Sequence, residues 1–296
     1  MAIRRILLTG AQGFVGSRLV RPLERAGYQV RCQDLFGTFR PNSISGDLSA
    51  PTIAQTAVRD IDVVVHLAGG KPQASQVYQN NVSSTSALIQ ACLTEKVQRF
   101  VFASTINVQG HGPFCPTPTV HDPPYFPIDE HQVACPEDNY SRSKLEGERI
   151  LRYACETSSM CSLALRLPGL WGPEFTDSYL PDDNCVFSPL QVVDPWHYLD
   201  LRDLAEAILR YLELAAPPPF AVGYLTAPDL AGAPTTQEHL EAAIPTWLEL
   251  WRTPPVGHQP LFCSKTVTEL LGWTPHHLWR KLPAWRRRLN RLRRWL

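Results

Sequence analysis

The stretch Thr9-Gly10-Ala11-Gln12-Gly13-Phe14-Val15-Gly16 decides the fold, because its glycines join a short apolar run to the start of a helical pattern. Glycine is needed where a backbone turns tightly, approaches a pyrophosphate and packs a helix against a strand. The phosphates then rest at the helix N-terminus, where unpaired N–H groups and the helix dipole favour anions. The spacing is GxxGxxG rather than GxGxxG, so the segment taken alone could be only a turn.

Asp34 favours the dinucleotide interpretation over a simple turn. It ends the second predicted strand, 18 residues after Gly16, where an acidic side chain binds the adenosine ribose of a dinucleotide. A carboxylate at this place repels a 2′-phosphate, so the expected cofactor is NAD, with NADP the weaker alternative. Arg31 and Arg40 lie near Asp34 in the sequence and keep that alternative open.

Apolar runs and helical patterns alternate outward from this turn over the first 170 residues. Strands are predicted at 3–8, 28–32, 62–67, 99–103 and 162–167, and helices at 14–26, 76–94 and 139–153. Apolar strands separated by helices are typical of a parallel sheet covered on both faces. The predicted fold class is therefore α/β, a Rossmann-type doubly wound parallel sheet with a small C-terminal substrate lobe.

The chain divides into three predicted parts. Residues 1–170 form the NAD-binding Rossmann domain, with an irregular loop at 110–137 that holds seven prolines. Residues 171–279 form a small substrate-binding lobe without a sheet of its own, whose helix at 201–214 returns to the Rossmann domain. Residues 280–296 form a basic amphipathic helix, in which arginines surround one apolar stripe.

The composition excludes several classes of protein. Of 296 residues, 44% are hydrophobic and 19% are charged, a globular balance that excludes a disordered or fibrous chain. No apolar run reaches the roughly 18 residues of a membrane span, and the first strand pattern leaves no room for a cleavable signal, so we expect a cytoplasmic protein. The eight cysteines form no CxxC pair, and the histidines are scattered. Reduced thiols and no metal site are therefore expected.

The charge is balanced over the whole chain but uneven along it. Residues 280–296 carry eight basic and no acidic residues, which leaves 20 basic and 28 acidic residues in the preceding 279. The acidic body does not favour nucleic acid as a partner. The basic helix could contact an acidic partner or a membrane surface, or dock on the acidic body of its own fold.

Tyr140 and Lys144 lie one turn apart on the same face of a predicted helix. A tyrosine, with a pKa of about 10, acts as a base near neutral pH only when a nearby cation lowers that pKa. Lys144 and the positive nicotinamide ring of an oxidised cofactor would supply this field. YxxxK alone is common by chance, and it gains weight from Ser104 and Thr105, hydroxyls at the C-terminal end of a strand, where open α/β sheets bind ligands.

Eight motifs occur in order between residues 3 and 210. They are TGxxGxxG at 9–16, Gly46-Asp47-Leu48, His66-Leu67-Ala68-Gly69, Asn81-Val82, Ser104-Thr105 with Val108-Gln109-Gly110, the Tyr140 and Lys144 pair, Arg166-Leu167-Pro168, and the stretch 198–207. This ordered set resembles the extended short-chain dehydrogenase/reductases, the NAD-dependent epimerase/dehydratase family. A weaker similarity continues in SKTVTELLGW at 264–273.

The resemblance implies a role for each matching residue. Thr105 would hold the reacting oxygen, Tyr140 would be the acid/base, and Lys144 would bind the nicotinamide ribose and lower the tyrosine pKa. The residues expected to bind the cofactor are Gly10, Gly13, Phe14, Val15, Gly16, Asp34, Asp47, Leu48, Leu67, Ala68, Gly69, Lys71, Asn81, Tyr140, Lys144 and Pro168. Within this set, Asp47 and Leu48 are expected beside the adenine.

One departure from the family's pattern concerns the reaction. Sugar-nucleotide dehydratases of this family carry an Asp-Glu pair directly after the catalytic hydroxyl residue, to protonate the substrate and eliminate water. Ile106 and Asn107 stand there in this chain, and neither exchanges a proton near neutral pH. Dehydratase activity is therefore not expected.

A second departure concerns the substrate. Gly169 stands where sugar-nucleotide epimerases carry an Asn that touches phosphate, and only 22 residues, with no Arg, separate Pro173 from Trp196. Losing one charge-assisted phosphate contact costs roughly 1.5–3 kcal/mol, so a smaller polar substrate is expected, either sugar-like or a hydroxy or keto compound. The residues expected to contact it are Ser104, Asn107, Trp171 and Trp196.

Three functions remain open from the sequence. We expect NAD-dependent hydride transfer at a secondary alcohol or ketone carbon, with net oxidation or reduction preferred. An NAD-dependent epimerase that passes through a transient ketone is the second. A non-catalytic NAD-binding regulatory protein is the third, and the presence of Thr105, Tyr140 and Lys144 together argues against it. The resemblance also implies a homodimer.

Overall fold

A computed structural model describes residues 3–37, 40–70, 75–110, 122–173, 197–232 and 234–281. Within these residues, the centre is a sheet of seven parallel strands in the order β3-β2-β1-β4-β5-β6-β9. The strands are β1 (Arg5–Thr9), β2 (Gln29–Asp34), β3 (Ile44–Ser45), β4 (Val63–His66), β5 (Arg99–Thr105), β6 (Cys161–Leu167) and β9 (Phe220–Tyr224). The strand order reverses between β1 and β4, the place where open α/β sheets bind ligands.

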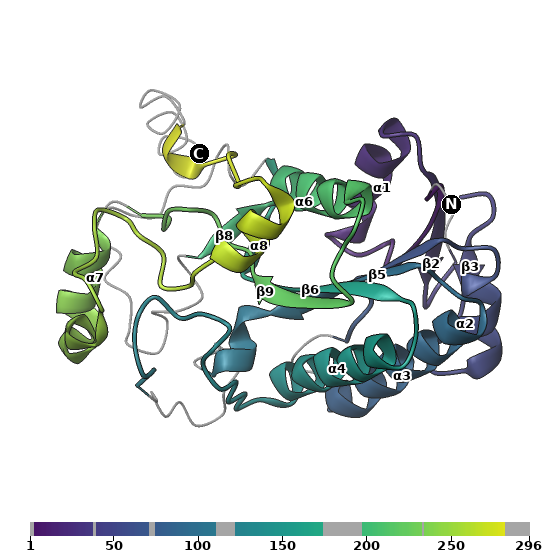
Figure 1. Cartoon of the computed structure of the whole chain (residues 1–296), viewed down its shortest axis with the longest axis horizontal. Coiled ribbons are helices and arrows are strands. Elements are labelled where there is room, and N and C mark those ends of the chain that lie inside the picture. The colour runs from purple at the N-terminus through teal and green to yellow at the C-terminus, as the bar shows by residue number, and fades with distance from the viewer. Residues whose placement is uncertain are drawn as a thin grey trace, which may run out of the picture.

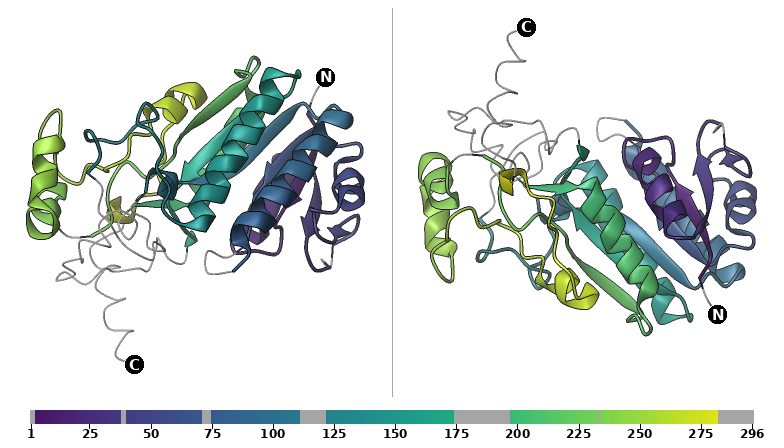
Figure 2. Two further views of the ribbon diagram at one scale, coloured as in Figure 1. Left: turned by 90° about the horizontal axis from the view of Figure 1, so that it is seen from below. Right: turned by 90° about the horizontal axis from the view of Figure 1, so that it is seen from above.

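Helices cover both faces of the sheet (Figures 1 and 2). On one face lie α1 (Gly16–Arg25) and α6 (Leu201–Glu213); on the other lie α2 (Pro51–Val58), α3 (Val77–Thr94) and α4 (Asn139–Glu156). Successive strand residues point to opposite faces, so Ile6 and Leu8 join one apolar cluster with α1 and α6, whereas Leu7 packs with α2, α3 and α4. The predicted doubly wound α/β fold is confirmed.

Strand β9 belongs to the large sheet, although the sequence pattern placed its residues in the lobe at 171–279. It pairs in parallel with β6, from Phe220 opposite Ser162 to Tyr224 opposite Arg166. The helix α8 (Lys265–Leu271) packs against it. As the edge of the sheet, β9 is only half buried along most of its length, so its sequence lacks the continuous apolar run of the inner strands.

The lobe also contains a small sheet, so the prediction that it has none is wrong. β7 (Gly169–Trp171) and β8 (Tyr198–Asp200) pair in parallel. Three residues are too few to show a periodic hydrophobic pattern. The other elements of this region are α7 (Thr236–Ala243), α8 and the 3₁₀ turns η3 (Pro245–Leu250) and η4 (Trp279–Lys281).

Part of the proline-rich loop builds the core of the lobe. Phe126 and Ile128 pack with Trp247, Trp251 and Phe262 in one buried cluster. Single strand-like bridges join Phe126 to Trp251 and Ile128 to Phe262. The described part of the loop, from residue 122, is therefore irregular in backbone but packed on its partner segments.

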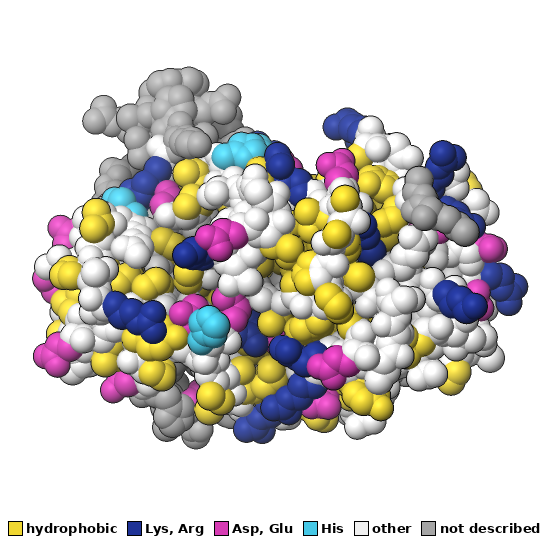
Figure 3. Space-filling view, viewed as in Figure 1, with side chains coloured by type: hydrophobic (Ala, Val, Ile, Leu, Met, Phe, Trp, Pro, Cys, Tyr) yellow, Lys and Arg dark blue, Asp and Glu magenta, His cyan; other side chains and the backbone are white. Residues whose placement is uncertain are grey.

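Two predictions fall partly or wholly outside the described residues: the first part of the proline-rich loop, and the basic helix at 280–296 from residue 282 onward. Across the part of the chain that the structure describes, no helix combines the length and apolar character needed to cross a membrane. On the face shown in Figure 3, basic and acidic side chains are interspersed rather than gathered by sign.

Candidate active site

The glycine-rich turn connects β1 to α1 and lies against the end of β4. Gly10 has a φ of +66°, and a Cβ on it would lie 2.9 Å from the backbone nitrogen of Ala68. A Cβ on Gly16 would overlap the carbonyl oxygen of Gly10. Larger residues are therefore excluded at both places. The start of α1 has no side-chain cap and no acid in its first turn, which suits a bound phosphate.

Asp34 closes β2 beside this turn. One carboxylate oxygen accepts the backbone N–H of Gln12 at 2.8 Å, and the other accepts the N–H of Leu35 at 2.8 Å. Each oxygen keeps a second lone pair, which can accept a ribose hydroxyl. Of the two residues expected beside the adenine, Leu48 is buried in the apolar core, and the side chain of Asp47 accepts an N–H in the turn before α2.

A buried histidine fixes the loop after β4, a role that its sequence motif does not indicate. The Thr9 hydroxyl oxygen accepts the N–H groups of Leu67 and Ala68 at 3.2 and 3.1 Å and lies 2.8 Å from Nδ1 of His66. With two donors already on the oxygen, the hydroxyl donates to Nδ1, and His66 Nε2 donates to Thr85 Oγ1 at 3.0 Å. Burial lowers the pKa of His66 to about 3, so the ring is neutral at physiological pH.

Asn81 connects the same loop to α4. Its Oδ1 accepts the N–H of Gly70 at 2.7 Å, and its Nδ2 donates to Ser143 Oγ at 2.9 Å. The Ser143 hydroxyl donates to the carbonyl oxygen of Tyr140 at 2.6 Å. Asn81 therefore positions the first turn of α4, a role that differs from the cofactor binding implied by the family resemblance. Ser143 was not predicted, since only its place inside YxxxK could have indicated it.

Tyr140 and Lys144 lie on the first two turns of α4, which Asp138 caps by accepting the N–H of Ser141 at 2.8 Å. The Lys144 Nζ is 5.7 Å from the centre of the Tyr140 ring and 5.0 Å from that of Phe102. Lys144 is only 4% exposed, and burial lowers its pKa to about 8. The side chain is thus mostly protonated at neutral pH, in surroundings that screen its charge little.

Three polar residues at or just after the end of β5 differ in their hydrogen-bond partners. Thr105 caps the 3₁₀ turn η1 (Ile106–Gln109), where its hydroxyl oxygen accepts the N–H of Asn107 at 3.2 Å. Ser104, expected to contact substrate, donates its hydroxyl to Glu148. Asn107 is 5% exposed, and its Oδ1 has no hydrogen-bond partner among the described residues.

Behind β5, Glu148 belongs to a buried polar network that joins the sheet to the lobe. The Arg166 guanidinium donates to both oxygens of Glu148, at 3.1 and 2.9 Å, and to the Tyr224 hydroxyl at 3.1 Å. Tyr224 in turn donates to Gln109 Oε1 at 2.8 Å. In the sequence, Arg166 and Gln109 stand out only as members of motifs, because no pattern indicates which buried partners they share.

One cavity of about 260 Å³ brings together the glycine turn, the end of β5 and the start of α4. Its walls are Gly10, Gly13, Phe14, Val15, Gly16, Leu67, Ala103, Ser104, Thr105, Tyr140, Lys144, Leu167, Pro168 and Leu170. Gly69 lies beside it, since a Cβ there would be 3.3 Å from Lys144 Nζ. Trp171 stacks on Tyr198, with ring centres 4.5 Å apart. Lys71 and Trp196 lie outside the described residues.

Comparisons with characterised proteins give distant relatives of two kinds. UDP-glucose 4-epimerase of Azospirillum brasilense is 29% identical over 177 residues, which cover 55% of this chain and 48% of that protein. The Vibrio cholerae UDP-glucose 4-epimerase is 30% identical over 57% of this chain and 53% of its own length. A 3-beta-hydroxysteroid dehydrogenase of Mycolicibacterium neoaurum is 28% identical over 57% of this chain and 48% of its own length. The chain thus spans about half the length of these relatives.

Solved structures share the fold over nearly the whole chain. A short-chain dehydrogenase/reductase superfamily protein from Agrobacterium tumefaciens with bound NAD has a TM-score of 0.69 at 23% identity, covering 98% of this chain and all of that one. A UDP-galactose 4-epimerase has a TM-score of 0.64 at 23% identity and covers 99% of each chain. The model of the NAD dependent epimerase/dehydratase family matches residues 6–223. This chain therefore belongs to the NAD-dependent epimerase/dehydratase family, within the extended short-chain dehydrogenase/reductases.

Proposed function

We propose that the protein transfers hydride between NAD and a secondary alcohol or ketone carbon of a small polar substrate. The observation that carries the proposal is the shared cavity, in which Thr105, Tyr140 and Lys144 line the same space as the glycine turn. A binding protein without chemistry would not require these three side chains together. The regulatory alternative is therefore the weaker interpretation.

The residues around the cavity fit NAD. The uncapped start of α1 suits the pyrophosphate, and Asp34 has free lone pairs for the hydroxyls of the adenosine ribose. Lys144 would bind the second ribose, and Pro168 would border the carboxamide. The Asp34 carboxylate repels a 2′-phosphate, so NAD is preferred to NADP. When bound, NAD supplies the hydride acceptor or donor.

Tyr140 would move the proton that accompanies the hydride. Its hydroxyl takes the proton of the substrate alcohol during oxidation and returns it during reduction. Lys144, buried and 5.7 Å from the Tyr140 ring, favours the ionised tyrosine by its charge. Thr105 lines the same cavity and can hydrogen-bond the reacting oxygen.

An NAD-dependent epimerase of nucleotide sugars is the second candidate, favoured by the relatives at 29–30% identity. In that reaction the substrate is oxidised to a ketone and reduced again on its other face, so the cofactor is regenerated in place. Gly169 and the segment without Arg before Trp196 argue against a diphosphate substrate. The small polar substrate remains our preference.

A substrate panel separates the two candidates. Free sugars, sugar acids, small hydroxy acids and UDP-sugars are each incubated with NAD and with NADP, and both NADH formation and product are followed. We expect NADH with a free polar substrate and little turnover with NADP. Interconversion of UDP-sugars without net NADH, together with NAD that survives purification in the denatured protein by mass spectrometry, would select the epimerase instead.

A further inference from the structure

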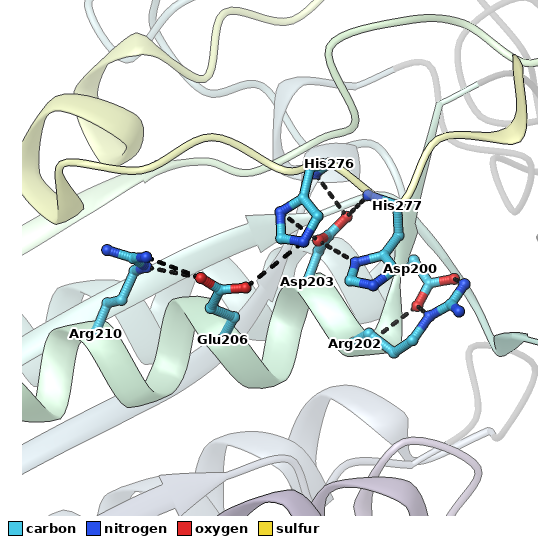
Figure 4. Close-up of polar contacts among 7 residues, drawn as sticks. All are labelled: Asp200, Arg202, Asp203, Glu206, Arg210, His276 and His277. Atoms are coloured by element: carbon cyan, nitrogen blue, oxygen red, sulfur yellow. Dashed lines mark hydrogen bonds and ion pairs between the residues drawn. The ribbon is translucent and has the colours of Figure 1, made fainter. Parts of the chain in front are cut away.

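Two histidines and two acids meet where the segment after α8 crosses the start of α6 (Figure 4). Asp203 and Glu206 come from α6, and His276 and His277 come from the segment between α8 and η4. Asp203 and His276 are 73 residues apart in the sequence, so no local spacing indicates the cluster. None of the four lines the cavity of the candidate active site.

Three possible ligand atoms converge in this cluster. Asp203 Oδ1 lies 2.7 Å from His277 Nδ1 and 3.6 Å from His276 Nδ1, and one such atom from each of the three residues lies within 4.8 Å of the others. Consecutive side chains of an extended backbone point to opposite sides. The rings of His276 and His277 instead lie 4.4 Å apart, at 35° to one another, and both reach the same carboxylate.

The Asp203 carboxylate is preset to present one oxygen to these rings. Its side chain is fully buried, and its Oδ2 accepts the backbone N–H groups of His276 and His277 at 3.2 and 2.9 Å. These two bonds fix the carboxylate relative to the two histidines and leave Oδ1 on the ring side. A carboxylate held in this way loses little freedom when it binds a cation.

Glu206 supports the far side of His276. Its Oε2 lies 3.9 Å from His276 Nε2, whereas its Oε1 accepts two N–H groups of Arg210. In metal sites a carboxylate at the second ring nitrogen fixes the tautomer and raises the basicity of the nitrogen that binds the metal. At 3.9 Å this pair is longer than a hydrogen bond, so the His276 ring would have to move toward Glu206 to donate from Nε2 and offer Nδ1 to a metal.

We propose that Asp203, His276 and His277 bind one transition-metal ion of the zinc type. Zinc stands about 2.0–2.1 Å from histidine nitrogens and ~2.0–2.2 Å from carboxylate oxygens, so ligand atoms of a tetrahedral site are about 3.3–3.4 Å apart. The 3.6 Å between Asp203 Oδ1 and His276 Nδ1 is already close to this value, whereas the 2.7 Å between Asp203 Oδ1 and His277 Nδ1 has to open by roughly 0.6–0.7 Å. His277 frees its Nδ1 by moving its proton to Nε2, and solvent reaches the half-exposed His276 to supply a water as fourth ligand.

The bound ion would fasten the segment that leads to η4 onto α6. Its role is structural, because its ligands stand apart from the residues that line the catalytic cavity. Without metal, the same residues are joined by hydrogen bonds alone. The test therefore has to separate a metal site from a hydrogen-bonded contact.

Untagged full-length protein, stripped with a chelator, is titrated with ZnCl₂ by calorimetry and with CoCl₂ by visible absorption, which reports tetrahedral cobalt. We expect one ion per chain. His276→Ala and His277→Ala should each weaken zinc binding at least tenfold, and Glu206→Gln should weaken it by about 10–100-fold. His131→Ala, at an exposed histidine outside the cluster, is the matched control and should bind zinc normally. At a zinc concentration near the dissociation constant of the wild type, zinc should raise the melting temperature of the wild type and of His131→Ala clearly more than that of the cluster variants.

His276→Gln keeps a polar side chain and shows whether a loss of binding comes from misfolding, since it should melt like the metal-free wild type and still fail to bind zinc. The proposal is overturned if the wild type binds no stoichiometric zinc. It is also overturned if the zinc affinity of His276→Ala and His277→Ala equals that of His131→Ala.

Discussion

Lys144 carries its ammonium 5.0 Å from the Phe102 ring and 5.7 Å from the Tyr140 ring, with only 4% of the residue exposed. Burial lowers its pKa from 10.5 to about 8. Between pH 8 and pH 10.5 the unfolded chain binds more protons than the folded one, so the free energy of unfolding rises with pH through this window. Below pH 8 the folded protein carries the full cost of the buried cation.

Replacing Lys144 should therefore stabilise the protein while removing its chemistry. Each unit by which the pKa is lowered corresponds to ~1.4 kcal/mol of free energy that the buried ammonium costs the folded state. The cation–π contacts of the ammonium with the two rings would also be lost on replacement, and they offset part of this cost. We expect Lys144→Met to raise the free energy of unfolding by about 1–3 kcal/mol at pH 7, with the difference nearly gone at pH 10.5. Urea unfolding at both pH values measures it. A variant that is less stable than the wild type at pH 7 would contradict this.

Asp34 should decide between the two nicotinamide cofactors. Asp34→Asn keeps a hydrogen-bonding side chain and removes the charge that repels a 2′-phosphate. The preference for NAD over NADP, measured as the ratio of their dissociation constants, should fall by about tenfold or more, since a charge-assisted bond contributes ~1.5–3 kcal/mol. Asp60→Asn, at an exposed acid at the end of the helix-to-strand turn, removes the same charge and should leave the ratio unchanged.

At the scale of elements, the contact between α4 and β5 positions the side chains proposed to be catalytic. Gly147 of α4 faces Phe102 of β5, and a Cβ on the glycine would lie 2.6 Å from the ring. The absence of a side chain thus sets how closely the helix that carries Tyr140 and Lys144 approaches the strand that ends in Thr105. Helix propensity alone would favour alanine here by about 1 kcal/mol.

Gly147→Ala should destabilise the protein despite that propensity. Overpacking a buried contact costs about 1–3 kcal/mol against a gain of about 1 kcal/mol, so a net loss of up to about 2 kcal/mol is expected. Combining it with Phe102→Leu, which removes the obstructing ring, should give a favourable coupling energy in a double-mutant cycle by urea unfolding. If Gly147→Ala is stabilising, the close approach of α4 to β5 is not as the structure has it.

The elements that the sequence predicts well are those with a long periodic pattern. The inner strands β4 and β5 are continuous apolar runs, and α4 shows its pattern over five turns. The strands β3, β7 and β8 are only two or three residues long, which is too short to show a repeating pattern of apolar side chains. The edge strand β9 follows Pro217-Pro218-Pro219 and is half buried, so neither its length nor its composition marks it.

The residues of the candidate site likewise fall into a group that the sequence predicts and a group that it does not. Thr105, Tyr140, Lys144 and the glycine turn stand in sequence motifs, and the order of those motifs along the chain is enough to indicate them. The partner of Ser104 could not be predicted, because Glu148 lies 44 residues away and meets it only through the packing of α4 on β5. The meeting of His277 with Asp203 likewise depends on tertiary packing.

At the scale of the whole molecule, the lobe and the large sheet are joined by common elements and are not two separate folding units. β9 follows α6 in the chain and completes the sheet, and Tyr224 at its end lies both in the lobe's apolar cluster and in the buried network with Arg166. Breaking such a network leaves buried polar groups without partners, which costs several kcal/mol. The lobe therefore gains stability from the sheet.

We expect both parts to unfold in one transition. All eight tryptophans lie at residue 171 or later, so their fluorescence reports the C-terminal part of the chain, whereas far-ultraviolet circular dichroism reports the helices and strands of the whole. The two signals should give the same melting temperature. Fluorescence that changes several degrees before the dichroism would show that the lobe melts alone.

The most direct test of the proposed activity is the turnover of Tyr140→Phe against Tyr153→Phe. Both variants lose one hydroxyl from α4, but Tyr140 lines the cavity whereas Tyr153 is 69% exposed. With a substrate that the wild type turns over with NAD, we predict that Tyr140→Phe loses at least a hundredfold in kcat and still binds NAD, while Tyr153→Phe keeps both. Unchanged turnover by Tyr140→Phe would contradict the assignment of Tyr140 as the acid/base.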